Sequence, residues 1–101
     1  MIKVTVIYGN PKSPEQFETY YKGTHLPLAA EIKGVSRAEF TKFMTGPDGA
    51  QPAFYRMAEL YFSSAAQMQQ SLNSPEGQAA VADIPKFATG GVNVVVGSVE
   101  G

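Results

Sequence analysis

The tripeptide Ser-Pro-Glu occurs twice in this chain, at residues 13–15 and 74–76. Serine is favoured just before the first turn of a helix and proline fits the first helical position, so each copy predicts a helix start. A segment typical of a β-strand precedes the first predicted helix, and another follows the last one. The chain is therefore expected to pass through strand, helix and strand once in each half.

Four segments alternate as strands do and are rich in β-branched and aromatic residues: 2–8, 35–45, 54–62 and 92–99. The turn sequence Gly-Pro-Asp-Gly at 46–49 predicts that the middle two form an antiparallel hairpin. Ser64 and Gln67 have capping-box spacing and begin a helix over 65–72, and the second Ser-Pro-Glu begins another that Pro85 ends. This βαββαβ order predicts an α+β fold, a ferredoxin-like sandwich with helices on one face of a four-stranded antiparallel sheet.

The composition is that of one folded domain spanning residues 1–101, with 44% hydrophobic and 17% charged residues. A net charge of −1, with scattered lysines and arginines, gives no reason to expect a nucleic-acid partner. The N-terminus does not resemble a signal peptide, and no apolar run approaches the ~20 residues of a membrane span. We therefore expect a cytoplasmic protein with no membrane partner.

Several kinds of chemistry lack the residues that they need. There is no cysteine, so disulfides and thiolate chemistry are not expected, and a single histidine argues against a dedicated metal site. No phosphate-binding or dinucleotide-binding glycine pattern occurs, since the pair at 90–91 alone predicts only a turn. We expect no bound cofactor.

The segment 13–28 offers more chemistry than the rest of the chain. Its helix has an aromatic stripe at positions i, i+3 and i+4, formed by Phe17, Tyr20 and Tyr21, and His25 continues the same series. Gly23 loosens the helix and Pro27 disfavours helical geometry in the residue before it. We therefore predict that the helix ends here and that His25 begins a loop reaching to Gly34, and loops of that length are often functional.

The predicted sheet has a second face that two helices cannot cover. The segments 35–45 and 54–62 have large apolar residues at both odd and even positions, so this face is expected to be apolar. An exposed apolar patch of that size predicts a partner, and the simplest is a second copy packed sheet to sheet about a two-fold axis. The alternatives are that these side chains are exposed singly or that the strands have a different phase.

Two runs of residues resemble the EthD family of the dimeric α+β barrel superfamily. The first is Phe17-x-x-Tyr20-Tyr21-x-x-x-His25-x-Pro27-Leu28, and the second, before the last strand, is Asp83-Ile84-Pro85-x-Phe87. The resemblance spans nearly the whole chain. It implies that two ferredoxin-like protomers pair their sheets into a barrel, each with a pocket between sheet and helices.

For function, the resemblance implies a range of activities. EthD is associated with ethyl tert-butyl ether degradation, and related barrels include cofactor-independent lactone isomerases, decarboxylases and monooxygenases of aromatic polyketide tailoring. Catabolism of a xenobiotic or polyketide compound is thus one expectation. The others are a non-catalytic protein that binds the same kind of ligand, and a dimerisation module with no ligand.

Four residues are candidates for catalysis. His25 has the ordinary pKa of a general acid or base, although it could instead cap the helix or bind a loop carbonyl. Tyr20 and Tyr21 could polarise a substrate oxygen, and at least one of them is expected to pack in the core. Asp83 lies at a helix end, where the dipole disfavours a carboxylate, which suggests a polar partner such as His25 unless the carboxylate is solvated.

A further set of apolar residues is expected to line the pocket and bind the small apolar or aromatic ligand, with ordinary core packing as the alternative. The set comprises Phe17, Leu28, Phe40, Tyr55 and Phe87.

Overall fold

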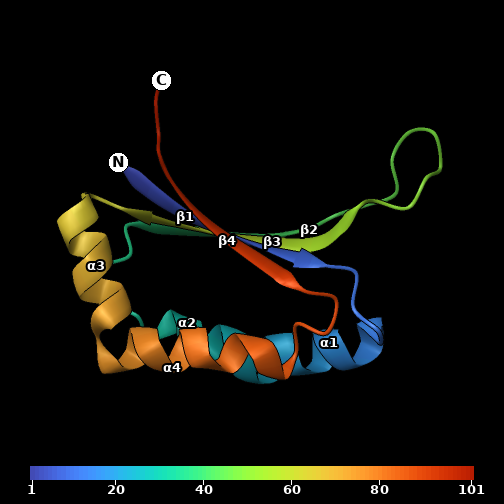
Figure 1. Ribbon diagram of the computed structural model, residues 1–101, viewed down its shortest axis with the longest axis horizontal. Helices are drawn as coiled ribbons and strands as arrows, with labels where there is room; N and C mark the ends of the chain where they lie inside the picture. Colours follow the sequence, from blue (N-terminus) through green and yellow to red (C-terminus); the bar gives the residue numbers. More distant parts are fainter.

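Strand β1 (Ile2–Gly9) lies inside a four-stranded antiparallel sheet of order β2-β3-β1-β4 in the computed structural model, which describes residues 1–101. The other strands are β2 (Arg37–Lys42), β3 (Phe54–Phe62) and β4 (Val92–Ser98). Helices α1 (Pro14–Tyr20), α2 (Leu26–Ala30) and α4 (Pro75–Asp83) form a layer on one face of the sheet, and α3 (Ala65–Asn73) stands at one end (Figure 1). The ferredoxin-like fold predicted from the sequence is confirmed.

The predicted helix starts are confirmed by the hydrogen bonds that cap them. The Ser13 hydroxyl accepts from the backbone N–H of Gln16 at 3.3 Å, and Ser74 accepts from that of Gly77 at 3.1 Å. Ser64 caps α3 in the same way, 3.1 Å from the N–H of Gln67. No helix combines the length and hydropathy needed to cross a membrane.

The predicted end of the first helix is wrong. Helical backbone continues beyond α1 through a π-helical turn, η1 (Tyr21–His25), and then through α2 to Ala30. In this turn the N–H of Leu26 donates to the carbonyl of Tyr21, five residues back. Pro27 falls in the first turn of α2, where a missing N–H costs little. His25 therefore lies inside a continuous helical segment and does not begin a loop.

The core lies between the helices and the two central strands. Val4, Val6 and Tyr8 alternate along β1 and face the helices, where they meet Phe17 of α1 and Ile84 of the short 3₁₀ turn η2 (Ile84–Lys86). Val6 pairs with Ala58 of β3 on one side and with Val94 of β4 on the other. Phe40 of β2 pairs with Ala58 in turn. Side chains of all four strands thus contribute to the face of the sheet that packs against the helices.

The face of the sheet that points away from the helices is only partly apolar. By their register, Ile7, Met57 and Val95 lie on it. By their register, Phe40, Leu60 and Phe62 share the helix-facing side with β1's valines. The opposite side carries a Lys3–Glu59 ion pair of 2.9 Å and the Arg37 guanidinium over the Tyr61 ring. Strand β3 thus directs Leu60 and Phe62 toward the helices and Met57 toward the outer face.

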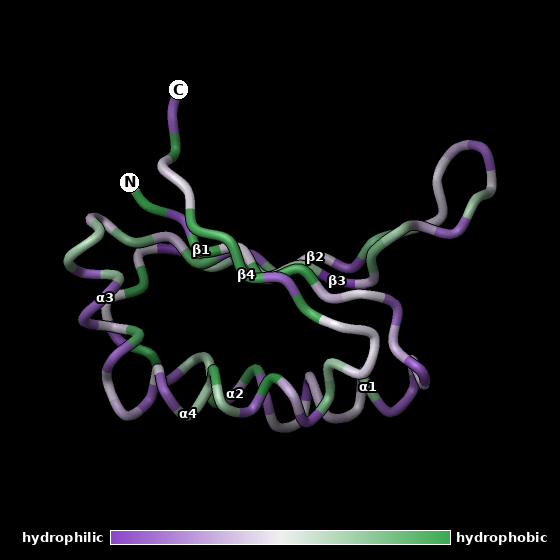
Figure 2. The backbone as a smooth tube through the Cα atoms, viewed as in Figure 1, coloured by the Kyte–Doolittle hydropathy of each residue, from purple (hydrophilic) through white to green (hydrophobic).

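Exposed apolar surface is concentrated instead on β4, at the edge of the sheet. Four of its valines are between 38% and 56% exposed, on both sides of the strand: Val92, Val94, Val95 and Val96. Figure 2 shows this strand as a mainly hydrophobic segment that leads to the C-terminus. An edge strand with exposed valines and unpaired backbone groups is a surface that can pair with another chain.

Candidate functional site

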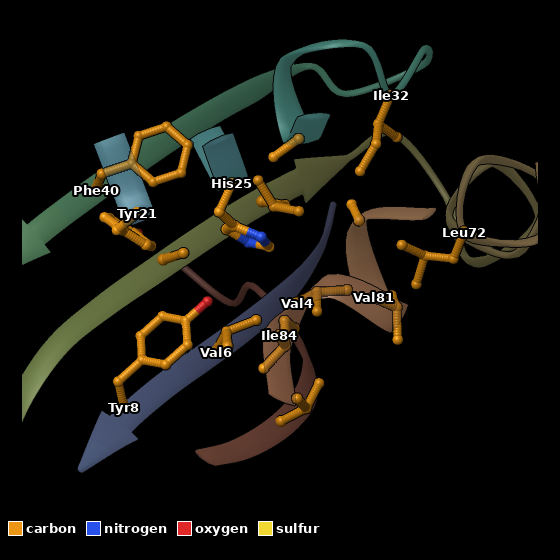
Figure 3. A pocket seen from close by; sticks show the side chains of 15 residues that line it. Val4, Val6, Tyr8, Tyr21, His25, Ile32, Phe40, Leu72, Val81 and Ile84 are labelled. Carbon is orange, nitrogen blue, oxygen red and sulfur yellow. The ribbon is translucent and has the colours of Figure 1, made fainter. Parts of the chain in front are cut away.

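A cavity of about 110 Å³ lies between the sheet and the helical layer (Figure 3). Its walls come from all four strands and from η1, α2, α3, α4 and η2, and 14 of its 15 lining residues are hydrophobic. The remaining lining residue is His25. A largely apolar cavity with few polar groups is typical of small-molecule sites.

A hydrogen-bonded chain of three side chains holds His25 in place. Its Nδ1 lies 3.1 Å from Oδ2 of Asp83, and the Tyr20 hydroxyl donates to Oδ1 of the same carboxylate at 2.6 Å. Both His25 and Asp83 are buried, with 6% and 4% of their surface exposed. The polar partner suggested for Asp83 by its position at a helix end is therefore His25, together with Tyr20.

The π-helical turn brings Tyr20 and His25 to the same carboxylate. Residues five apart on a regular α-helix are separated by about 140° around its axis, so they point in different directions. In η1 the hydrogen bond spans five residues, and residues five apart come closer to one side of the helix. The wider turn therefore makes the three-residue arrangement possible.

The environment sets the proton positions in this chain. Burial lowers the pKa of His25, and the hydrogen bond and charge of Asp83 offset only part of that effect. Burial alone would raise the pKa of Asp83, but the hydrogen bonds from Tyr20 and His25 together hold it below its ordinary value. At neutral pH the neutral imidazole thus donates its Nδ1–H to the Asp83 carboxylate, and Nε2 keeps a free lone pair.

Two tyrosines line the cavity. The Tyr21 ring stacks near His25, with centroids 5.8 Å apart and planes 20° apart, and its buried hydroxyl has no hydrogen-bond partner. Tyr8 of β1 directs its hydroxyl into the cavity from the sheet side (Figure 3). Burial raises the pKa of Tyr21 to about 12 and raises that of Tyr8, so both remain neutral hydrogen-bond donors.

Sequence comparison identifies the family. A model of the EthD domain matches residues 10–91. The chain belongs to the EthD family.

Two relatives are similar to this chain over nearly its whole length, and a more distant structure shares its fold. The uncharacterised 11.0 kDa protein of the thcB–thcC intergenic region of Rhodococcus erythropolis is 41% identical over 94% of this chain and 91% of its own. An EthD-family crystal structure from Bacillus halodurans is 30% identical, covers 99% of both chains and has a TM-score of 0.92. A Thermobifida fusca structure described as a dimeric ferredoxin-like protein of unknown function is 16% identical, covers 97% of this chain and 90% of its own, and has a TM-score of 0.70.

The structure of this EthD-family protein brings together the four residues predicted for catalysis. His25 and Tyr21 line the cavity. Asp83 lies behind His25 and is hydrogen-bonded to it, and Tyr20 is hydrogen-bonded to Asp83. Tyr8 was missed by the sequence analysis. The signal was present, because Tyr8 continues the alternating face of the first strand, where Val4 and Val6 also lie.

Of the apolar residues predicted to line the pocket, one lines the cavity and the others lie elsewhere. Phe40 lines the cavity. Phe17 and Phe87 lie in the core beside it, and the Phe87 ring packs on His25 with centroids 4.6 Å apart. Tyr55 packs on Phe17 at 4.9 Å, and Leu28 is half-buried on α2, so neither reaches the cavity.

An ion pair next to Tyr21 anchors α1 to the sheet. The Arg56 guanidinium donates to both carboxylate oxygens of Glu18, at 2.8 and 2.6 Å, and lies 5.1 Å from the Tyr21 ring. These hydrogen bonds from Arg56 lower the pKa of Glu18 to about 2, against the opposing effect of burial.

No group of three or more His, Asp and Glu side chains gathers to form a metal site.

Proposed function

We propose that this EthD-family protein is a cofactor-free enzyme that moves a proton on a small aromatic or lactone-like molecule. The observation that supports this is one neutral imidazole, oriented by a buried carboxylate, in a cavity whose other walls are hydrophobic. A base is most effective when it is unprotonated and near its substrate, and both conditions are met by Nε2 of His25.

The proposed reaction is an isomerisation through an enolate. Nε2 of His25 accepts a proton from a carbon next to a carbonyl group, and the electrons of that C–H bond move onto the carbonyl oxygen. A hydroxyl of Tyr21 or Tyr8 donates a hydrogen bond to this oxygen, which stabilises the developing charge. When the substrate is a β,γ-unsaturated carbonyl compound, this enolate is conjugated with the C=C bond. The imidazolium then returns the proton to the γ-carbon, the C=C bond moves to the α,β position, and the C=O bond re-forms. Isomerisation needs only these groups, so we favour it over decarboxylation and oxygenation.

The size of the cavity suggests how much of the ligand it holds. An engineered protein cavity of about 150 Å³ binds benzene, so a space of about 110 Å³ suits a single small ring or a lactone. The absence of a cation in its walls favours an uncharged reacting group.

Hydrogen exchange at the acidic carbon tests this proposal without knowledge of the natural substrate. We expect the protein to accelerate exchange of the methyl protons of acetophenone, or of the ring CH₂ of α-angelica lactone, in deuterated buffer, as followed by proton NMR. An effect of about 100-fold or more over buffer is expected of a positioned base. Binding without exchange would instead support the non-catalytic binding protein.

We also infer that two copies of the chain pair through the outer face of the sheet and β4. The support is the row of exposed valines on β4 and the dimeric relative from Thermobifida fusca. Sedimentation at micromolar concentration should therefore give twice the 10.8 kDa mass of one chain. Val95→Lys should yield a single subunit, whereas Met44→Lys, at an 84% exposed position away from β4, should not. A wild-type protein that sediments as a stable single subunit would contradict this inference.

A further inference from the structure

A second hollow lies beside the cavity, toward the β2 edge of the sheet. This groove, between α2 and strands β2 and β3, has a volume of about 440 Å³, and eight of its nine lining residues are hydrophobic. It shares four lining residues with the cavity: Ala29, Ile32, Phe40 and Leu60. The groove and the cavity are therefore neighbouring apolar spaces that share part of their lining.

We propose that the groove is a subsite for an uncharged chain attached to the ring that reacts beside His25. The substrate class is then a ring ketone or lactone that carries an alkyl or acyl chain. This inference rests on the proposed function, because it assumes that the ligand's reactive part occupies the cavity.

The size of the cavity supports a ligand with two parts. A cavity of about 110 Å³ falls below the roughly 300–1,000 Å³ of typical ligand sites. A molecule larger than one ring must therefore extend beyond the cavity, and the groove is an apolar space directly beside it.

Phe40 lies at the junction of the two spaces. It lines both, and Figure 3 shows its ring at the edge of the cavity, on β2. The ring is 44% exposed, so a chain lying in the groove would cover apolar surface that is now in contact with water. The side chain of Phe40 thus separates the reacting ring of the ligand from its chain.

The charge of the groove indicates an uncharged chain. Arg37 is its single charged lining residue, and its guanidinium lies over the Tyr61 ring at 4.2 Å. Tyr61 pairs with Lys3 and points to the outer face of the sheet, so this cation is directed away from the groove. A chain ending in a carboxylate would find no partner here.

A homologous series of phenyl alkyl ketones, from acetophenone to octanophenone, tests the subsite by calorimetric binding. We expect the dissociation constant of the wild-type protein to fall roughly two- to fourfold per added methylene group, as burial of that group in an apolar site predicts. The gain should end where the chain passes the end of the groove.

Two matched variants locate the effect. Ala38 lines the groove but not the cavity, so Ala38→Trp should abolish the gain with chain length and leave acetophenone binding unchanged. Met44→Trp, at an 84% exposed position that lines neither the cavity nor the groove and lies away from β4, should leave the whole series unchanged. An equal response to both variants, no gain with chain length, or no binding by any ketone would overturn the proposal.

Binding and chemistry fail separately in this design. If the affinity increases with chain length and Ala38→Trp abolishes that increase, but no ketone exchanges protons, the subsite is supported and the proposed enzyme activity is contradicted. If exchange is catalysed but the affinity does not depend on chain length, the proposed activity is supported and the subsite is contradicted.

Discussion

Replacing His25 by glutamine is expected to slow the proposed proton exchange by about 10²- to 10⁴-fold, the usual contribution of a positioned general base. The glutamine amide can still donate a hydrogen bond to Asp83, but it has no basic nitrogen to place in the cavity. Binding of acetophenone should change little, because the remaining 14 lining residues are hydrophobic and are retained. Exchange rates by proton NMR and affinities by calorimetry separate the two effects.

Tyr20→Phe is the control for this variant. It removes the hydroxyl that donates to Asp83 at 2.6 Å and leaves both His25 and the cavity wall in place. Its rate should lie between those of the wild type and His25→Gln.

The exchange rate of the wild type should not change with pH near neutrality. It should decrease only at a pH lower than 6.5, because burial lowers the pKa of His25 from that value. If His25→Gln exchanges protons as fast as the wild type, the imidazole is not the base.

The sequence predicts the order of elements in this fold well because that order depends on local signals. The caps formed by Ser13, Ser64 and Ser74 act over three residues, and each is found where the pattern placed it. The turn after β2 is equally local. Sheet order and helix coverage then follow from the few topologies that a βαββαβ chain can adopt.

The phase of the sheet depends on information that is not local. In β3 both odd and even positions carry large apolar residues, so alternation alone does not say which set meets the helices. The register with β1 decides it, because Leu60 lies opposite Val4 and Ala58 opposite Val6. The outer face therefore carries a mixture of apolar and charged side chains, in place of the largely apolar set that the sequence predicted.

The prediction that the helix ends near His25 was wrong for a different reason. Gly23 and Pro27 are each good evidence for a helix end when they are considered alone. The π-helical turn accommodates both, because Gly23 lies within it and Pro27 falls in the first turn of the α-helix that follows. A change of helix type over five residues leaves no periodic signal long enough to detect.

The pairing of His25 with Asp83 joins residues 58 positions apart, and the sequence offered one physical hint of it. A carboxylate near a helix C-terminus is unfavourable unless a donor compensates it. Phe17 and Phe87 show the limit of such reasoning. Their aromatic character predicts burial, but whether a buried ring lines a cavity or fills the core beside it depends on packing that the sequence does not contain.

Protonation of Glu18 is expected to destabilise the fold as the pH falls from about 4.5 to about 2. The pKa of Glu18 is lowered from 4.5 to about 2 in the folded chain, chiefly by the hydrogen bonds from Arg56. The unfolded chain therefore binds a proton in this window before the folded chain does, and stability is lost as the pH decreases. At about 1.4 kcal/mol per pKa unit, the loss amounts to at most about 3.5 kcal/mol. Urea denaturation at a series of pH values measures it.

Glu18→Gln isolates this contribution from those of other carboxyl groups. Arg56 is 8% exposed, so removing the charge of its partner should lower the free energy of unfolding at pH 7 by roughly 2 kcal/mol. The difference between wild type and variant should then shrink as the pH falls toward 2, because the wild-type carboxyl becomes neutral as well. Glu31→Gln, at an exposed position on the surface, should follow the wild type throughout. A constant difference between wild type and Glu18→Gln at every pH would show that the Arg56–Glu18 pair does not depend on ionisation.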